Sequence, residues 1–88
     1  MSDVHIASCV AFARPDAVAG IARAIAATGL AEVPRQDGER GRLVILIEAP
    51  SAAQVLDVMD AIRALEGVLA IHLAYQHAES ESDMKEAP

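Results

Sequence analysis

Aromatic residues and cysteine are scarce in this sequence of 88 residues, which contains only Phe12, Tyr75 and a single cysteine, Cys9. One cysteine excludes a disulfide within the chain and fits a reducing compartment. No run of 18 apolar residues occurs, so we expect no segment that spans a membrane. Residues 1–3 do not combine a basic segment with a following apolar one, so we expect no secretory signal.

Positive charge is also scarce, because 7 lysines and arginines stand against 13 aspartates and glutamates, which gives a net charge of −6. A nucleic-acid partner needs a basic surface, and a single strand also needs aromatic rings on which its bases stack. The sequence offers neither, so nucleic acid is excluded as a partner. A negative field instead attracts cationic partners at long range.

The charge divides the chain into two parts. Residues 79–88 are polar and acidic, and we expect them to form a disordered tail. Residues 1–78 are enough for one small domain. Since 53% of the chain is hydrophobic and only 2% is aromatic, we expect a core of alanine, valine, leucine and isoleucine.

Apolar patterns predict four strands and two helices. Apolar and β-branched runs predict strands at residues 4–13, 30–36, 42–49 and 68–76. Helical spacing of apolar residues predicts one helix at residues 15–28 and a second that follows Pro50 and Ser51 and ends at Gly67. Proline cannot donate a hydrogen bond within a sheet, so Pro34 makes the second strand an edge strand.

The resulting order, βαββαβ, predicts an α+β fold of the ferredoxin-like type. Two split βαβ units with right-handed crossovers give a four-stranded antiparallel sheet with both helices on one face. The first and third strands are the most apolar, so we place them at the centre of the sheet. The opposite face of the sheet is then left without helices.

Polar residues indicate which side of the third and last strands belongs to this uncovered face, whereas the first strand has no clear alternation and is assigned by placing Ser8 on that face. Because His72 and Gln76 indicate that side in the last strand, Leu69, Ile71, Leu73 and Tyr75 should face the helices. We assign ten residues to the uncovered face: Ile6, Ser8, Val10, Phe12, Val44, Leu46, Glu48, Ala70, His72 and Ala74. A contiguous apolar patch of this kind marks an interaction site, either for a partner peptide or for a second copy of the chain.

The sequence carries no constellation typical of catalysis or metal binding. It has no phosphate-binding glycine loop and no nucleophile elbow. His5, His72 and His77 lack the spacing of a metal site. Arg42 and Glu48 fit a solvated rim better than a catalytic pair. We therefore predict a protein that is not an enzyme and that uses no metal or cofactor.

Three segments together resemble the NapD family, which supplies the cytoplasmic maturation chaperone of the periplasmic nitrate reductase. They are HIASCVAFARPD at residues 5–16, RLVILIEA at residues 42–49 and LEGVLAIHLAYQH at residues 65–77. The resemblance covers residues 4–78. The sequence departs from the family pattern at Cys9, where a larger aliphatic residue is expected, and at Phe12, where the family often has a polar one.

This resemblance implies a ferredoxin-like fold, no catalysis and a cytoplasmic location. It implies binding to the twin-arginine signal peptide of the nitrate reductase catalytic subunit, whose Tat export is held back until its cofactors are loaded. The peptide-binding residues would be those of the uncovered face. Glu32 and Glu48 are candidate partners for the arginines of the peptide, although a solvated rim also explains both glutamates.

Several alternatives stay open on the sequence alone. The peptide can bind as a helix on the sheet face or as an extra strand at the edge of the sheet. We expect a monomer, with a weak homodimer as the alternative state. A different class of function is a small-molecule-sensing regulatory domain of ACT type, which shares the βαββαβ order and acts as a dimer.

Overall fold

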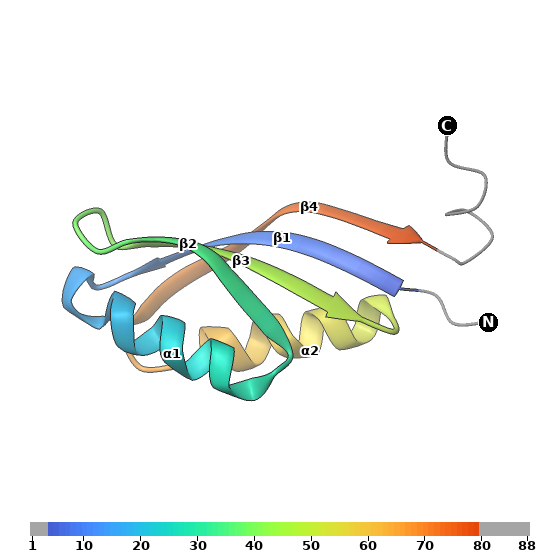
Figure 1. Cartoon of the computed structure of the whole chain (residues 1–88), viewed down its shortest axis with the longest axis horizontal. Helices are drawn as coiled ribbons and strands as arrows, with labels where there is room; N and C mark the ends of the chain where they lie inside the picture. The colour runs from blue at the N-terminus through green and yellow to red at the C-terminus, as the bar shows by residue number, and fades with distance from the viewer. Residues whose placement is uncertain (1–3, 80–88) are drawn as a thin grey trace.

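The computed structural model describes the backbone of residues 4–79 and the side chains of residues 4–76. One sheet and two helices make up this part of the chain (Figure 1). In chain order the elements are β1 (Val4–Ala13), η1 (Pro15–Ala17), α1 (Val18–Thr28), β2 (Ala31–Asp37), β3 (Arg42–Ala49), α2 (Ala52–Arg63) and β4 (Val68–Glu79). The predicted ferredoxin-like α+β fold is confirmed.

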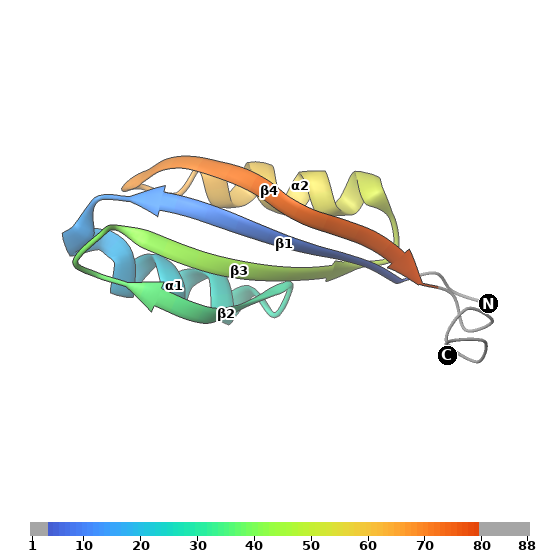
Figure 2. The same cartoon turned by 90° about the horizontal axis from the view of Figure 1, so that it is seen from above.

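The four strands form one antiparallel sheet in the order β2-β3-β1-β4. The central positions of β1 and β3 agree with the prediction. Both helices lie on the same side of the sheet, α1 beneath β2 and β3 and α2 beneath β3, β1 and β4 (Figures 1 and 2). The other side of the sheet carries no helix of the described chain.

Local signals in the sequence explain where the helices begin and end. Pro15 opens the single turn of 3-10 helix, η1, that precedes α1, because a first helical position needs no N–H donor. Gly29 ends α1 in the left-handed region at φ 72°, where glycine is favoured, and its N–H donates to the carbonyl of Ala26. Ser51 caps α2, since its Oγ accepts a hydrogen bond from the N–H of Gln54 at 3.2 Å.

The second helix is shorter than predicted. It ends at Arg63, and a turn stabilised by the N–H of Leu65 donating to the carbonyl of Ile62 leads to Gly67. Gly67 itself has a φ of 95° and starts the approach to β4. The apolar spacing continues through Leu65, which explains why the helix was expected to reach Gly67.

The core lies between the sheet and the helices. Leu43, Ile45 and Ile47 of β3 are fully buried against residues such as Ile25 of α1 and Val55 of α2. On β1 the buried residues are Ala7, Cys9, Ala11 and Ala13, as expected if Ser8 faces away from the helices. Burial raises the pKa of the Cys9 thiol because desolvation disfavours the thiolate, so Cys9 serves as a small core residue.

The prediction for β4 is partly wrong. Ile71 is buried as expected, but Leu69, Leu73 and Tyr75 are 69%, 44% and 59% exposed. The register explains this difference for Tyr75: Cys9 pairs with Leu73 and Ser8 pairs with Tyr75, so Ala74 is an extra residue in β4. An extra residue reverses the alternation that follows it. Tyr75 therefore lies on the side of Ser8, away from the helices.

The same irregularity affects the residues after Tyr75. Gln76 pairs with Ala7, which faces the helices, so Gln76 does not mark the uncovered face as predicted. Leu69 is a second extra residue, since Phe12 pairs with Ala70 and Ala13 with Val68. The backbone of β4 continues to Glu79, beyond the predicted end at residue 76. The remainder of the predicted acidic tail, residues 80–88, lies outside the described residues.

Candidate functional site

The uncovered side of the sheet, which we call the open face, collects most of the residues expected to bind a partner. The register arranges its residues in cross-strand rows that run from β2 towards β4. These rows are Asp37, Arg42, Phe12 and Ala70; Arg35, Val44, Val10 and His72; Glu32, Leu46, Ser8 and Tyr75; and Glu48 with Ile6. Figure 2 looks down on this face, with the helices behind the strands.

The centre of the open face is apolar. Ile6 and Val10 of β1 and Val44 and Leu46 of β3 are half-buried, although no helix covers them. Side chains on neighbouring strands shield one another in this way when they lie opposite or diagonal to each other. One polar side chain, that of Ser8, lies among these four, between Leu46 and Tyr75. A continuous apolar strip therefore follows the two central strands.

An aromatic contact closes the strip at one end. The rings of Phe12 and His72 meet edge to face, with centroids 5.9 Å apart and an interplanar angle of 69°. Phe12 is 38% exposed, and Ala70 lies opposite it on β4. Because alanine leaves one side of the Phe12 ring uncovered, the ring stays available to an apolar partner.

Two glutamates border the strip at the other end. Glu32 lies opposite Leu46 on β2, and Glu48 follows two residues after Leu46 on β3. Together with Leu30 and Leu46 they line a small cavity of about 160 Å³. Within residues 4–76, neither carboxylate forms an ion pair. Both negative charges are therefore available to a cationic partner.

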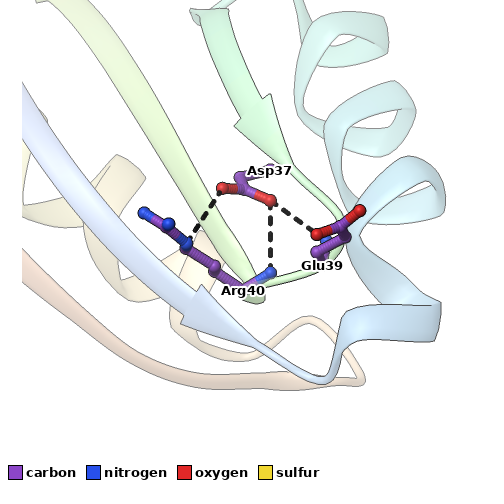
Figure 3. Close-up of polar contacts among 3 residues, drawn as sticks. All are labelled: Asp37, Glu39 and Arg40. Carbon is purple, nitrogen blue, oxygen red and sulfur yellow. Dashed lines mark hydrogen bonds and ion pairs between the residues drawn. The ribbon is translucent and has the colours of Figure 1, made fainter.

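In contrast to the end bordered by the two glutamates, the hairpin between β2 and β3 has arginine side chains beside it. The Asp37 carboxylate accepts the N–H groups of Glu39 and Arg40 at 3.1 and 3.2 Å and pairs with the Arg40 guanidinium at 3.9 Å (Figure 3). Arg35 and Arg42 lie beside this turn on the open face, where they line a shallow depression together with Val44. Neither guanidinium is ion-paired within the described part of the chain.

Tyr75 belongs to the open face although the sequence pattern assigned it to the core. It lies beside Ser8 because Ala74 interrupts the pairing of β4 with β1. One signal for this position exists in the sequence: a buried tyrosine hydroxyl needs a hydrogen-bond partner, and the expected core is entirely aliphatic. Ala74 itself is exposed and has no partner residue in the register with β1.

Both edges of the sheet are poorly suited to pairing with an added strand. In β2 the pairing with β3 is interrupted between Glu32 and Arg35, around Pro34. In β4 the irregularities at Leu69 and Ala74 interrupt an otherwise long edge strand. Proline and β-bulges both hinder pairing with a further strand. The open face therefore offers a more regular docking surface than either edge.

Residues typical of metal sites do not gather in the described structure. Among residues 4–76, no three histidine, cysteine, aspartate or glutamate side chains are close enough to hold one ion. His5 and His72 belong to different strands, and His72 contacts Phe12. No helix within residues 4–79 has both the length and the apolar character needed to cross a membrane.

Comparisons with known proteins match nearly the whole domain. The model of the NapD family, described as NapD protein, matches residues 4–80. Chaperone NapD of Escherichia coli K12 is 27% identical over 79 residues, which cover 90% of this chain and 91% of that protein. Chaperone NapD of Haemophilus influenzae is 21% identical over 80 residues, which cover 91% of this chain and 86% of that protein.

A solved structure agrees with the sequence matches. The solution structure of the E. coli Tat proofreading chaperone protein NapD superimposes with a TM-score of 0.77 and 28% sequence identity. The match covers 89% of this chain and 81% of that one.

Proposed function

The chain belongs to the NapD family of chaperones, and from this membership we propose which client protein it binds. The client is the catalytic subunit of the periplasmic nitrate reductase, and the bound segment is its twin-arginine signal peptide. Binding takes place in the cytoplasm and delays export through the Tat translocase until the cofactors are loaded. Competition by mass action is sufficient, because a peptide held by the chaperone cannot engage the translocase.

The open face is the observation that carries this proposal. A twin-arginine signal peptide combines a cationic segment with an apolar segment. The apolar strip along β1 and β3 suits the apolar segment, and the carboxylates of Glu32 and Glu48, which form no ion pair within residues 4–76, suit the arginines. The net charge of −6 adds long-range attraction.

We propose that the contact residues are the ten assigned to this face, with Glu32 and Tyr75 added. The set consists of Ile6, Ser8, Val10, Phe12, Glu32, Val44, Leu46, Glu48, Ala70, His72, Ala74 and Tyr75. The peptide binds as an amphipathic helix laid on the sheet, because both edges of the sheet are irregular. The protein acts by binding alone and performs no chemistry on its client.

The size of the strip predicts a moderate affinity. Burial of roughly 500 Å² of apolar surface at about 25 cal/mol per Å² gives a gross gain of about 12 kcal/mol. Ordering the peptide and losing its free motion offset much of this gain. A moderate net affinity suits a chaperone that must bind the precursor and later release it.

The matches to the NapD family favour this function over a regulatory domain of ACT type. Regulatory domains of that type bind small ligands between paired copies. The open face offers instead a long strip with charges at its ends, and this shape suits a segment of chain better than a compact metabolite. We propose that the protein binds its client as a monomer.

Isothermal titration calorimetry with a synthetic twin-arginine leader tests the proposal. We expect one leader to bind per chain, and we expect a leader with both arginines replaced by glutamine to bind more weakly. Raising the salt concentration from about 0.05 to about 0.5 M should weaken binding only in part, since salt screens the charges but not the apolar contact. Absence of binding, or equal binding of a scrambled leader, would refute the proposal.

A further inference from the structure

The open face has opposite charges at its two ends. Glu32 and Glu48 border the end near the cavity that they line with Leu46. At the other end the β2–β3 hairpin carries Arg35, Arg40 and Arg42 against Asp37 and Glu39. Asp37 is already engaged by Arg40 and by two backbone N–H groups of the turn (Figure 3). The hairpin end is therefore the basic end of an otherwise acidic protein.

The two ends are far enough apart to act separately. Arg42 and Glu48 lie on the same strand, six residues apart, which corresponds to about 20 Å of extended chain. This separation exceeds the Debye length of about 8 Å at physiological salt, so a charge at one end hardly senses the other. A helix of about 13 residues spans the same distance at 1.5 Å per residue. A bound leader therefore reaches both ends at once.

The charges favour one of the two ways to lay a peptide along the strip. If the cationic segment lies at the acidic end, its arginines meet Glu32 and Glu48, and the uncharged apolar segment lies over Val44, Val10 and Phe12. In the reverse direction the arginines meet Arg35 and Arg42. The dipole of a helical peptide adds to the preference, since its positive N-terminus and negative C-terminus then face charges of the opposite sign.

We propose that the leader binds with a single polarity, its N-terminal arginines over Glu32 and Glu48 and its C-terminal end over Phe12 and Arg42. This inference rests on the proposed function and adds the direction of the bound chain. It also fixes where the client continues: the polypeptide that follows the leader leaves the chaperone at the β2–β3 hairpin. The folded part of the client then lies beside the basic end of the open face.

Paramagnetic broadening in NMR spectra tests this polarity. Two synthetic leaders would carry a nitroxide label, one at the N-terminus and one at the C-terminus, and each would be added to the full chain labelled with ¹⁵N. We expect the N-terminal label to broaden the amide signals of Leu46 and Glu48, and the C-terminal label to broaden those of Phe12 and Arg42. Reduction of each nitroxide with ascorbate supplies the diamagnetic reference.

The outcomes separate this inference from the proposed function. The reversed pattern, or equal broadening at both ends by both labels, overturns the polarity while the proposed function stands. A leader that perturbs no amide signal refutes the proposed function and the polarity with it.

Charge variants provide an independent test. Glu48→Gln should weaken binding about 2- to 5-fold, as expected for one exposed ion pair. Glu39→Gln removes the same charge at the hairpin end and should leave the dissociation constant within about 1.5-fold of the original, because no arginine of the leader lies there. Equal weakening by both variants would show that only the net charge matters, and it would overturn the polarity.

Discussion

Alternate residues of a single strand, β3, have different roles in this molecule. Leu43, Ile45 and Ile47 are fully buried beneath the helices, whereas Val44 and Leu46, on the other side of the strand, remain partly exposed. Both sets are aliphatic, so hydrophobicity alone does not distinguish a core residue from an interface residue. The helix-covered face holds the fold together, and the open face carries apolar surface that contributes less to stability. The predictions below contrast the two faces.

The largest contrast concerns stability. Ile45→Ala should lower the free energy of unfolding by about 2–5 kcal/mol, because it leaves a cavity in a close-packed core. Leu46→Ala, one residue further along, should lower it by about 1 kcal/mol, since Leu46 is only half-buried and solvent can fill the space. Urea denaturation followed by circular dichroism measures both. Equal losses for the two variants would contradict the distinction between the faces.

A thiol probe should distinguish the faces by reaction rate. Cys9 is fully buried and its pKa is raised, so its reaction with a thiol reagent at pH 8 requires local unfolding. A chain carrying both Ser8→Cys and Cys9→Ala places its single thiol on the open face instead. We expect this thiol to react about 100-fold faster or more. Comparable rates in folded protein would contradict the assignment, and unfolded chains in urea supply the reference rates.

Leader binding should depend on the open face, whereas stability depends mainly on the helix-covered face. Val44→Asp should weaken leader binding about 30-fold or more, because the apolar segment would bury an ionised carboxylate without a partner. The matched control is Leu56→Asp, which introduces the same charge at an exposed leucine of α2 and should leave binding within about 2-fold. Melting curves would check that both variants stay folded. Unchanged affinity in Val44→Asp would remove the open face as the binding surface.

A smaller effect tests the corrected alternation of β4. If the irregularity at Ala74 places Tyr75 on the open face, Tyr75→Ala should weaken leader binding about 5-fold, since it removes an aromatic anchor at the margin of the strip. Leu56→Ala, which truncates an exposed side chain on α2, is the control and should leave calorimetric titrations unchanged. Identical affinities for the wild type and Tyr75→Ala would leave Tyr75 outside the contact surface.

The sequence was sufficient to predict the fold and the two central strands. On β3 the polar residues Arg42 and Glu48 lie six positions apart, so they mark the open face and fix the alternation of their neighbours, whereas β1 was assigned only by placing Ser8 on that face. The capping residues likewise mark the start of α2 and the end of α1. These signals are local, and each depends on only a few neighbouring residues.

The sequence was not sufficient for β4. His72 and Gln76 lie four positions apart and therefore suggest one side of a regular strand, but Ala74 is an extra residue that reverses the alternation between them. An alanine carries no signal that distinguishes a bulge from a regular position. Its role becomes visible only in the pairing with β1, which is a tertiary property. The register therefore places Tyr75 on the open face, a position that the sequence indicates only through its hydroxyl group, which would need a hydrogen-bond partner in the core.

The direct test of the central claim is an NMR titration of the ¹⁵N-labelled chain with the twin-arginine leader, which follows every assigned amide. If the apolar strip binds the leader, the largest chemical-shift changes fall on Ile6, Ser8, Val10, Val44 and Leu46, while the exposed sides of α1 and α2 change little. Changes concentrated on the helices, or confined to the outer edge of β4, would contradict the account.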